Sequence, residues 1–127
     1  MRMIYGIGTD VVDTSRIARS LERHGERFAH KILTETEWAE YNLSCKPIVF
    51  LAGRFAAKEA LSKAFGTGLR YPVSLDFITV SHNDFGKPYF EFHPKLSQLI
   101  IDHGITSHHL SISDENNLAC AFVILEK

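Results

Sequence analysis

Residues 55–68 constrain this chain most, because they predict a helix that carries charged groups among side chains suited to a core. Apolar residues recur there at helical spacing, and the closing glycines are typical of a helix end. The helix would hold Lys58, Glu59 and Lys63 within about two turns. One interpretation is a solvated face with an ordinary Glu59–Lys63 pair. The other is a site for a metal-complexed, doubly anionic substrate, which two ammonium groups and a carboxylate would suit.

Length and composition predict one globular domain over residues 1–127, because 45% hydrophobic and 23% charged residues are ordinary for a packed chain. No apolar run reaches the roughly 18 residues of a spanning helix, and the N-terminus lacks a signal-peptide pattern. We therefore expect a cytoplasmic protein with no membrane partner. A net charge of −1 argues against a general nucleic-acid binder. Cys45 and Cys120 lack CxxC or zinc-type spacing, which favours two reduced thiols.

Five basic side chains recur at steps of three, four, four and four residues, which would place them on one helical face. This basic stripe consists of Arg16, Arg19, Arg23, Arg27 and Lys31. Gly25 interrupts the segment, so the stripe could bend across two short helices. A solvated face and a docking surface for an acidic partner both fit the spacing.

Periodicity and capping residues predict one strand and several helices in the first half of the chain. A helix follows the first strand, with Thr14 or Ser15 as its N-cap. Thr34 followed by Glu37 is a capping box that opens a further short helix. The strand covers residues 3–12, the short helix 35–41 and the long helix about 49–65.

The second half favours strands, because aromatic and β-branched residues alternate there with turn-rich segments. The predicted strands cover 75–81, 89–92, 108–113 and 118–125. Pro94 begins a helix that ends at about His103, before Gly104. The sum is an α+β fold, a small antiparallel sheet with helices packed on it.

Asp10 is unusual because it lies on a strand that is otherwise apolar. Gly6 and Gly8 just before it allow another segment to approach the backbone closely. A third glycine is absent, so a dinucleotide-binding fingerprint is not supported. Magnesium prefers oxygen ligands and is often held by one or two carboxylates plus substrate phosphates. Asp10 and Glu59 could be that pair if strand and helix pack together; a capping or turn role for Asp10 is the alternative.

Several segments, in order and over essentially the full chain, resemble the bacterial holo-acyl-carrier-protein synthases, the small 4′-phosphopantetheinyl transferases. The first segment reads Gly-Ile-Gly-Thr-Asp-Val-Val-Asp, and the central one reads Phe-Leu-Ala-Gly-Arg-Phe-Ala-Ala-Lys-Glu-Ala. These and the remaining segments cover 6–17, 33–37, 50–68, 86–88 and 110–124. The resemblance implies transfer of 4′-phosphopantetheine from coenzyme A to a serine of apo acyl carrier protein. The second product would be adenosine 3′,5′-bisphosphate, and the reaction would support fatty acid biosynthesis.

The resemblance also implies site residues. Asp10 and Glu59 would bind Mg²⁺, and Lys63 would contact the pyrophosphate of coenzyme A. Phosphoryl transfer needs charge neutralisation and alignment, so Lys63 would stabilise the leaving bisphosphate. Glu59 is the candidate for orienting or activating the serine hydroxyl. Further substrate-binding candidates are Lys58, which belongs to the same motif, and Gly86, Lys87 and Pro88, which resemble the segment near the adenosine.

The partners implied by the resemblance are coenzyme A and an acidic acyl carrier protein. Members of this family are typically homotrimers with active sites at subunit interfaces. The carrier-protein docking residues would be Arg16, Arg23 and Arg27.

One position departs from the family pattern, since many members have histidine where this chain has Asp114. An aspartate would repel phosphate, so no phosphate-binding role is carried over to it; His109 or Ser113 could compensate. Two other functions use the same residues. One is a magnesium-dependent phosphoesterase acting on a nucleotide, and the other is a non-catalytic module that binds acyl carrier protein through the basic stripe.

Overall fold

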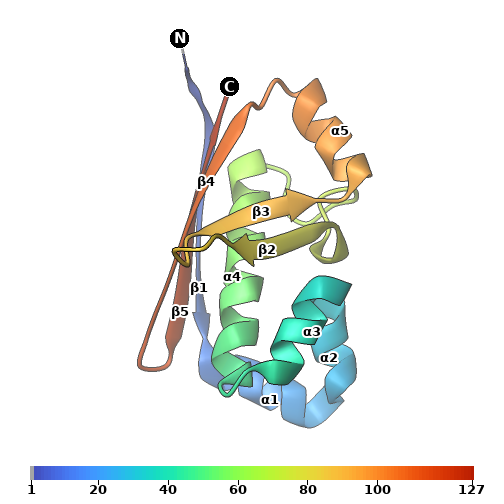
Figure 1. Cartoon of the computed structure of the whole chain (residues 1–127), viewed down its shortest axis with the longest axis vertical. Coiled ribbons are helices and arrows are strands. Elements are labelled where there is room, and N and C mark those ends of the chain that lie inside the picture. Colours follow the sequence, from blue (N-terminus) through green and yellow to red (C-terminus); the bar gives the residue numbers. More distant parts are fainter. Residues whose placement is uncertain (1) are drawn as a thin grey trace.

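The computed structural model describes residues 2–127 and has the predicted α+β architecture, with helices packed on antiparallel sheets (Figure 1). In the first half the elements are β1 (Ile4–Asp13), α1 (Thr14–His24), α2 (Glu26–Ile32), α3 (Glu35–Leu43) and α4 (Pro47–Phe65). In the second half they are the 3₁₀ turn η1 (Leu75–Phe77), β2 (Ile78–His82), β3 (Pro88–Phe92), α5 (Pro94–Asp102), β4 (Ser107–Glu115) and β5 (Leu118–Glu126).

The strands form two sheets instead of one. A three-stranded sheet has the order β1-β5-β4, and β2 pairs only with β3. The predicted strand over 75–81 begins as the turn η1, and pairing with β3 starts only at Ile78. His108 on β4 joins the two sheets, because its Nε2 accepts a hydrogen bond of 3.0 Å from the Phe90 N–H on β3.

The ends of the helices follow local capping. Asp13 caps α1, in place of the predicted Thr14 or Ser15, because its carboxylate accepts hydrogen bonds from the Ser15 N–H and hydroxyl at 2.9 and 2.7 Å. Gly25, with φ of 64°, separates α1 from α2 as the sequence suggested. The capping box of α3 is confirmed, with both of its reciprocal bonds present.

Helix α4 occupies the centre of the molecule, lying along the three-stranded sheet and crossing β2 (Figure 1). Its sheet-facing side is rich in small buried residues, and the inward side chains of β5 are also small or aliphatic. The buried residues of these two elements that form the core include Ala52, Ala56, Ala60, Ala64, Ala119, Ala121, Val123 and Leu125.

The glycines of β1 allow this helix and strand to approach at backbone distance. A Cβ atom at Gly6 would lie 1.9 Å from the carbonyl oxygen of Ala64, and one at Gly8 would lie 1.9 Å from that of Ala60. No side chain fits there without moving the helix. The close backbone approach expected at these glycines is therefore confirmed, and its partner is α4.

In Figure 1 the helices of residues 2–127 lie on one side of the three-stranded sheet. The other face of this sheet carries exposed apolar side chains. Ile7 and Val11 on β1 are each 58% exposed, and Phe122 on β5 is 44% exposed. Ile7 lies opposite Ile124 in the register, and Val11 lies opposite Cys120. Across residues 2–127, no helix combines the length and hydropathy that a bilayer crossing would need.

Gly8→Ala should lower the free energy of unfolding by about 2–3 kcal/mol, because the added methyl group meets a backbone carbonyl that cannot yield. Gly53→Ala, inside α4, is the matched control. A Cβ atom at Gly53 would make an ordinary 3.6 Å contact with Ile112 of β4. That change should be neutral or stabilising by up to about 1 kcal/mol. Urea denaturation of both variants measures the difference, and equal stabilities would contradict this account of the helix–strand contact.

Candidate functional site

The contact between β1 and α4 brings three of the predicted site residues together. Asp10 comes from β1, whereas Glu59 and Lys63 are one turn apart on α4. The Lys63 ammonium donates hydrogen bonds to an Asp10 carboxylate oxygen at 3.1 Å and to the Thr9 carbonyl at 3.0 Å. Lys63 thus forms its ion pair across the two elements and, within the part of the chain that the structure describes, not with Glu59.

Asp10 and Glu59 line one cavity of about 370 Å³ at the junction of β1, α1, α2 and α4. Arg16 of α1 lies at the same cavity, so a cation of the basic stripe borders the carboxylates. The other lining residues are mainly apolar: Val11, Val12, Ile17, Ser20, Phe28 and Phe55. A polar edge beside an apolar wall suits a ligand that is charged at one end.

The Glu59 carboxyl holds its proton more strongly than a free glutamate. Partial burial raises its pKa above the ordinary 4.5, and the charge of Asp10 raises it further, while Lys63 opposes both effects. A carboxyl group with a raised pKa in a cavity is a candidate for proton transfer. Two mutually repelling carboxylates are also a favourable environment for a cation.

The donor set fits magnesium better than zinc. Asp10 and Glu59 offer carboxylate oxygens, and residues 2–127 contain no group of three or more His, Cys, Asp or Glu side chains placed to hold a metal ion. Zinc sites in proteins usually have three or four such ligands. Magnesium is usually held by one or two carboxylates and completes its shell with water and substrate phosphates.

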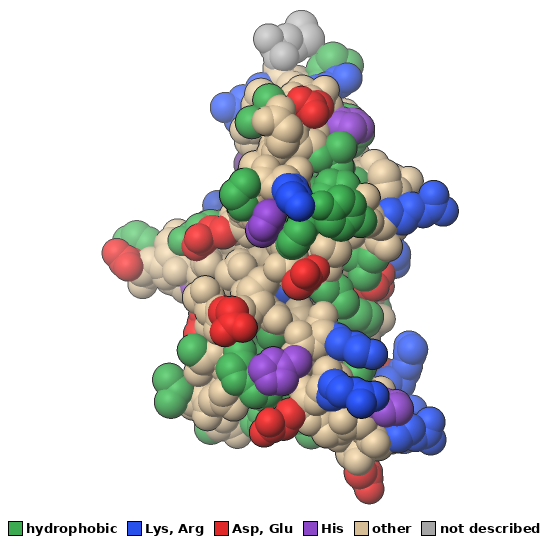
Figure 2. Space-filling model, turned by 90° about the vertical axis from the view of Figure 1, so that its right-hand side faces the viewer, with side chains coloured by type: hydrophobic (Ala, Val, Ile, Leu, Met, Phe, Trp, Pro, Cys, Tyr) green, Lys and Arg blue, Asp and Glu red, His purple; other side chains and the backbone are tan. Residues whose placement is uncertain are grey.

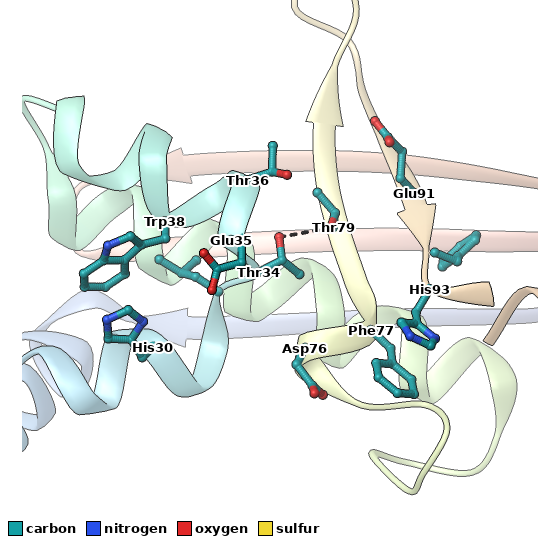
Figure 3. A pocket seen from close by; sticks show the side chains of 12 residues that line it. His30, Thr34, Glu35, Thr36, Trp38, Asp76, Phe77, Thr79, Glu91 and His93 are labelled. Carbon is teal, nitrogen blue, oxygen red and sulfur yellow. Dashed lines mark hydrogen bonds between the residues drawn. The ribbon is translucent and has the colours of Figure 1, made fainter. Parts of the chain in front are cut away.

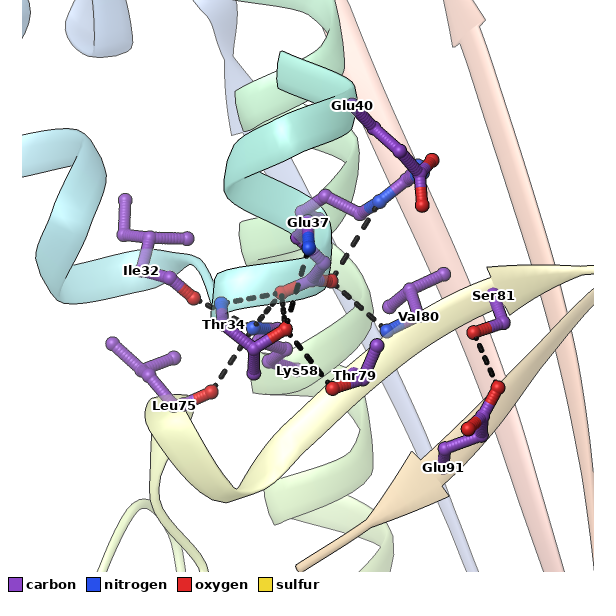
Figure 4. Close-up of polar contacts among 11 residues, drawn as sticks. Ile32, Thr34, Glu37, Glu40, Lys58, Leu75, Thr79, Val80, Ser81 and Glu91 are labelled. Carbon is purple, nitrogen blue, oxygen red and sulfur yellow. Dashed lines mark hydrogen bonds and ion pairs between the residues drawn. The ribbon is translucent and has the colours of Figure 1, made fainter. Parts of the chain in front are cut away.

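Lys58 does not belong to this cavity. Its side chain is fully buried, and its ammonium donates to Glu37 Oε1 at 2.6 Å and to the carbonyls of Ile32 and Leu75 at 2.6 and 3.0 Å (Figure 4). These acceptors use all three N–H groups of an ammonium. Burial lowers the pKa of Lys58, and the Glu37 carboxylate opposes that effect. The prediction that Lys58 binds substrate is not supported, because no donor is left for a ligand.

Sequence reasoning also missed that Glu37 is more than a helix cap. Its carboxylate accepts from Lys58, from the Thr34 N–H at 3.0 Å and from the Val80 N–H at 2.9 Å (Figure 4). Arg54 lies 3.7 Å from the same carboxylate and is itself nearly buried. A capping box predicts only the local bond, so nothing in the spacing indicates the partners on α4 and β2.

The basic stripe bends at Gly25, so that it follows α1 and then α2. Figure 2 shows Lys and Arg side chains gathered at the lower end of the face in view, where Figure 1 places these helices. All five stripe residues are exposed, and none forms an ion pair with another part of residues 2–127. Their charges are therefore available to a partner.

Gly86, Lys87 and Pro88 lie apart from the cavity, at the turn between β2 and β3. Asn83 shapes this turn, because its side-chain oxygen accepts from the N–H groups of Phe85 and Lys87 at 2.9 and 3.0 Å. Asp114 is exposed near the end of β4, opposite Ala119. One copy of the chain does not bring these residues to Asp10 and Glu59.

A larger cavity, about 500 Å³, lies elsewhere and is lined by none of the predicted site residues (Figure 3). His30 stacks on Trp38 at one end with ring centres 3.5 Å apart, and His93 stacks on Phe77 at the other at 3.9 Å. A hydrogen bond between Thr34 and Thr79 crosses its floor. Size alone does not identify a functional site. The smaller cavity is lined by Asp10 and by Glu59, the carboxyl group whose pKa is raised.

Glu59→Gln should raise the midpoint of thermal unfolding at about pH 7 in chelator and leave it unchanged near pH 4. Because the folded pKa of Glu59 lies above the ordinary 4.5, the wild type loses stability as the pH rises through the folded value. Below a pH of about 4.5, Glu59 is protonated in both the folded and the unfolded protein, and its charge no longer lowers the stability of the fold. Glu115→Gln, which removes an exposed carboxylate far along β4, is the control. A Glu59→Gln effect independent of pH would contradict this assignment.

Comparison with known proteins places the chain in a family. Residues 6–123 match the family model described as the 4′-phosphopantetheinyl transferase superfamily. The holo-[acyl-carrier-protein] synthase of Nitrosospira multiformis is 69% identical, over 98% of this chain and 100% of its own. The crystal structure of the holo-[acyl-carrier-protein] synthase from Neisseria meningitidis aligns with a TM-score of 0.97 at 48% identity. The alignment covers 98% of this chain and 100% of the Neisseria chain.

A third relative was solved with a ligand. The holo-(acyl-carrier-protein) synthase from Bacillus anthracis, in complex with CoA (3′,5′-ADP), aligns with a TM-score of 0.82 at 38% identity, over 98% of each chain. The matches span nearly the whole sequence and agree in both sequence and fold. This chain belongs to the 4′-phosphopantetheinyl transferase superfamily.

Proposed function

We propose that this protein transfers the 4′-phosphopantetheine group of coenzyme A to a serine of apo acyl carrier protein, in support of fatty acid biosynthesis. The observation that carries the proposal is the cavity in which Asp10, Glu59 and Arg16 meet, with Lys63 paired to Asp10 at 3.1 Å. The full-length relatives named holo-[acyl-carrier-protein] synthase support the same reaction. The location that we expect for this activity is the cytoplasm.

In the reaction the serine oxygen forms a new bond to the phosphorus that carries the pantetheine arm. The phosphorus–oxygen bond to adenosine 3′,5′-bisphosphate breaks, and its electron pair leaves with the bisphosphate. Glu59 would orient the serine hydroxyl and take its proton, directly or through water. Lys63 would place positive charge at the leaving group, since its ammonium is hydrogen-bonded to Asp10, which lines the cavity.

Asp10 and Glu59 would hold Mg²⁺, whose charge when bound neutralises the pyrophosphate of coenzyme A. The role of the protein is then mainly positioning and charge stabilisation, as in other phosphoryl transfers. A charge aimed at the reacting phosphates contributes on the order of 3 kcal/mol. An exposed ion pair contributes about 0–1 kcal/mol, so the site charges outweigh any single arginine of the stripe.

The basic stripe would dock the acidic carrier protein, with Arg16, Arg23 and Arg27 as the proposed contacts. Arg16 supports this role best, because it lines the site cavity as well as the exposed surface of α1. A carrier protein that lies on α1 would therefore bring its serine close to Glu59. The charges are exposed and unpaired within the described part of the chain, which favours steering by long-range attraction.

A homotrimer is the assembly that we propose. The uncovered apolar face of the three-stranded sheet, with Ile7, Val11 and Phe122 exposed, supports burial against other copies of the chain. A shared site would also give a role to Gly86, Lys87 and Pro88, which one copy keeps apart from its own cavity. In this proposal they contact the adenosine part of coenzyme A at the site of a neighbouring copy.

Incubation of apo acyl carrier protein with this protein, coenzyme A and magnesium should add the mass of one phosphopantetheine group. Asp10→Asn should reduce the rate by about a hundredfold or more while the fold survives, because it removes a proposed metal ligand. Asp102→Asn, on α5 away from the cavity, should stay active. Mass spectrometry of the carrier protein measures both effects, and near-normal turnover of Asp10→Asn would contradict the proposed site.

The same assay separates the competing functions. Bisphosphate released from coenzyme A without carrier protein would favour a phosphoesterase. Binding of carrier protein without any change in its mass would favour a non-catalytic module.

Arg16→Glu should raise the KM for carrier protein by up to about tenfold and change the KM for coenzyme A far less. The substitution replaces an attraction by a repulsion at the edge of the cavity. Arg70→Glu, an exposed arginine outside the stripe, is the matched control. Steady-state kinetics at two salt concentrations test the idea, because added salt should weaken the wild-type interaction. An unchanged carrier-protein KM would rule out docking through Arg16.

A further inference from the structure

We infer that Lys58 is a positioning residue that holds helix α2 against α4, and that it thereby sets the carrier-protein side of the site. That α2 docks a carrier protein rests on the proposed function. The contacts of Lys58 are observed in the structure. Lys58 lies directly before Glu59 in α4, yet it is fully buried on another side of the helix. It contacts no cavity residue through its ammonium.

The ammonium joins three segments that are distant in sequence. It donates to the Ile32 carbonyl at the end of α2, to the Leu75 carbonyl in η1 and to the Glu37 carboxylate in α3 (Figure 4). The bonds to Ile32 and Glu37 are short, 2.6 Å each. Charge-assisted hydrogen bonds of this length are the strong ones, so the end of α2 is held firmly to the centre of the molecule.

Helix α2 needs such an attachment. It spans only seven residues, Glu26–Ile32, and its N-cap Gly25 supplies no side-chain hydrogen bond. Helices shorter than about 12 residues are marginal on their own, so tertiary contacts must hold α2 in place. Its buried anchors are Ala29 and Ile32, and the Lys58 bond is made to the second of these.

The position of α2 matters to the site because Phe28 forms part of the cavity wall with Asp10 and Glu59. Phe28 lies one turn before Ile32, the residue whose carbonyl Lys58 holds. Arg27 and Lys31 of the basic stripe are on the same short helix. A shift of α2 would therefore move one cavity wall and two docking charges together, while Glu59 and Lys63 stay on α4.

Glu37 keeps the Lys58 ammonium pointed at α2. Its carboxylate is itself held by the Thr34 and Val80 N–H groups, so the acceptor cannot follow a moving lysine. Removing Lys58 alone would leave this carboxylate buried beside Arg54, at 3.7 Å. A variant that neutralises both partners avoids an unpaired buried charge.

The test is the double variant Lys58→Met with Glu37→Gln, which nearly keeps the side-chain volumes and leaves the net charge of the interior unchanged. Arg54 keeps its ion pair with Glu40 at 3.3 Å. If α2 occupies its docking position only about a tenth of the time, the KM for carrier protein should rise about tenfold. The KM for coenzyme A should stay within about twofold, because Asp10, Glu59 and Lys63 are untouched. Leu96→Ala, which opens a void in the core beneath α5, is the control for a general loss of stability. It should leave both KM values unchanged.

Hydrogen exchange gives a readout that needs no transferase activity. The amide protons of α2 should exchange faster in the double variant, whereas those of α4 should not. In the wild type the α2 amides should be protected nearly as well as those of α4. If the wild-type α2 exchanges like an unattached short helix, or the double variant leaves its exchange unchanged, the positioning role is overturned.

The kinetic result separates the two proposals. A wild type without any transfer would refute the proposed function and still leave the exchange experiment to decide on Lys58. Faster α2 exchange with an unchanged carrier-protein KM would refute the link between α2 and docking. A parallel change in both KM values would do so as well, since it would show general damage to the site.

Discussion

The backbone contact between β1 and α4 is the constraint on which the rest of the structure depends. Because Gly6 and Gly8 have no side chains, the strand lies directly against the carbonyls of Ala60 and Ala64. Asp10 follows two residues after Gly8 and points to the cavity, where Glu59 of the helix also lies. The proximity of the Asp10 and Glu59 carboxylates therefore depends on this packing. Side chains at Gly6 and Gly8 would push the strand and the helix apart, and the two carboxylates with them.

Helix α4 serves two environments at once. Successive residues of a helix point about 100° apart, so Lys58 can face the interior while Glu59 faces the cavity. Burial changes the pKa of both, lowering that of Lys58 and raising that of Glu59, since each environment disfavours the charged form. Hydrogen bonds to one carboxylate and two carbonyls offset the burial of the Lys58 ammonium. The positive charge of Lys63 partly offsets the burial of the Glu59 carboxylate.

The proposed docking surface and the candidate site are connected through the strand β1. Asp13 ends β1 and caps α1, so Arg16 comes within the first turn of the helix and lies at the cavity. The stripe then continues past Gly25 onto α2, which Lys58 ties to α4. In this arrangement an acidic partner would contact two helices that are attached to the site from opposite ends.

Much of this could be predicted from the sequence alone, because the relevant signals are local. Helical periodicity, the capping box at Thr34 and Glu37, and the glycines after Phe65 predicted elements that the structure confirms. The ordered motifs predicted the family. The basic spacing and the glycine at position 25 predicted the bend between α1 and α2. Each of these depends on residues a few positions apart.

The tertiary structure decided which charges face the site. Lys58 and Lys63 look equivalent in the sequence, as two lysines of one motif, but they differ in what distant segments bring against them. Ile32, Glu37 and Leu75 enclose Lys58, whereas Asp10 meets Lys63 at a half-exposed position. Burial of a charge depends on acceptors supplied by the whole fold, and helical spacing alone contains no information about them.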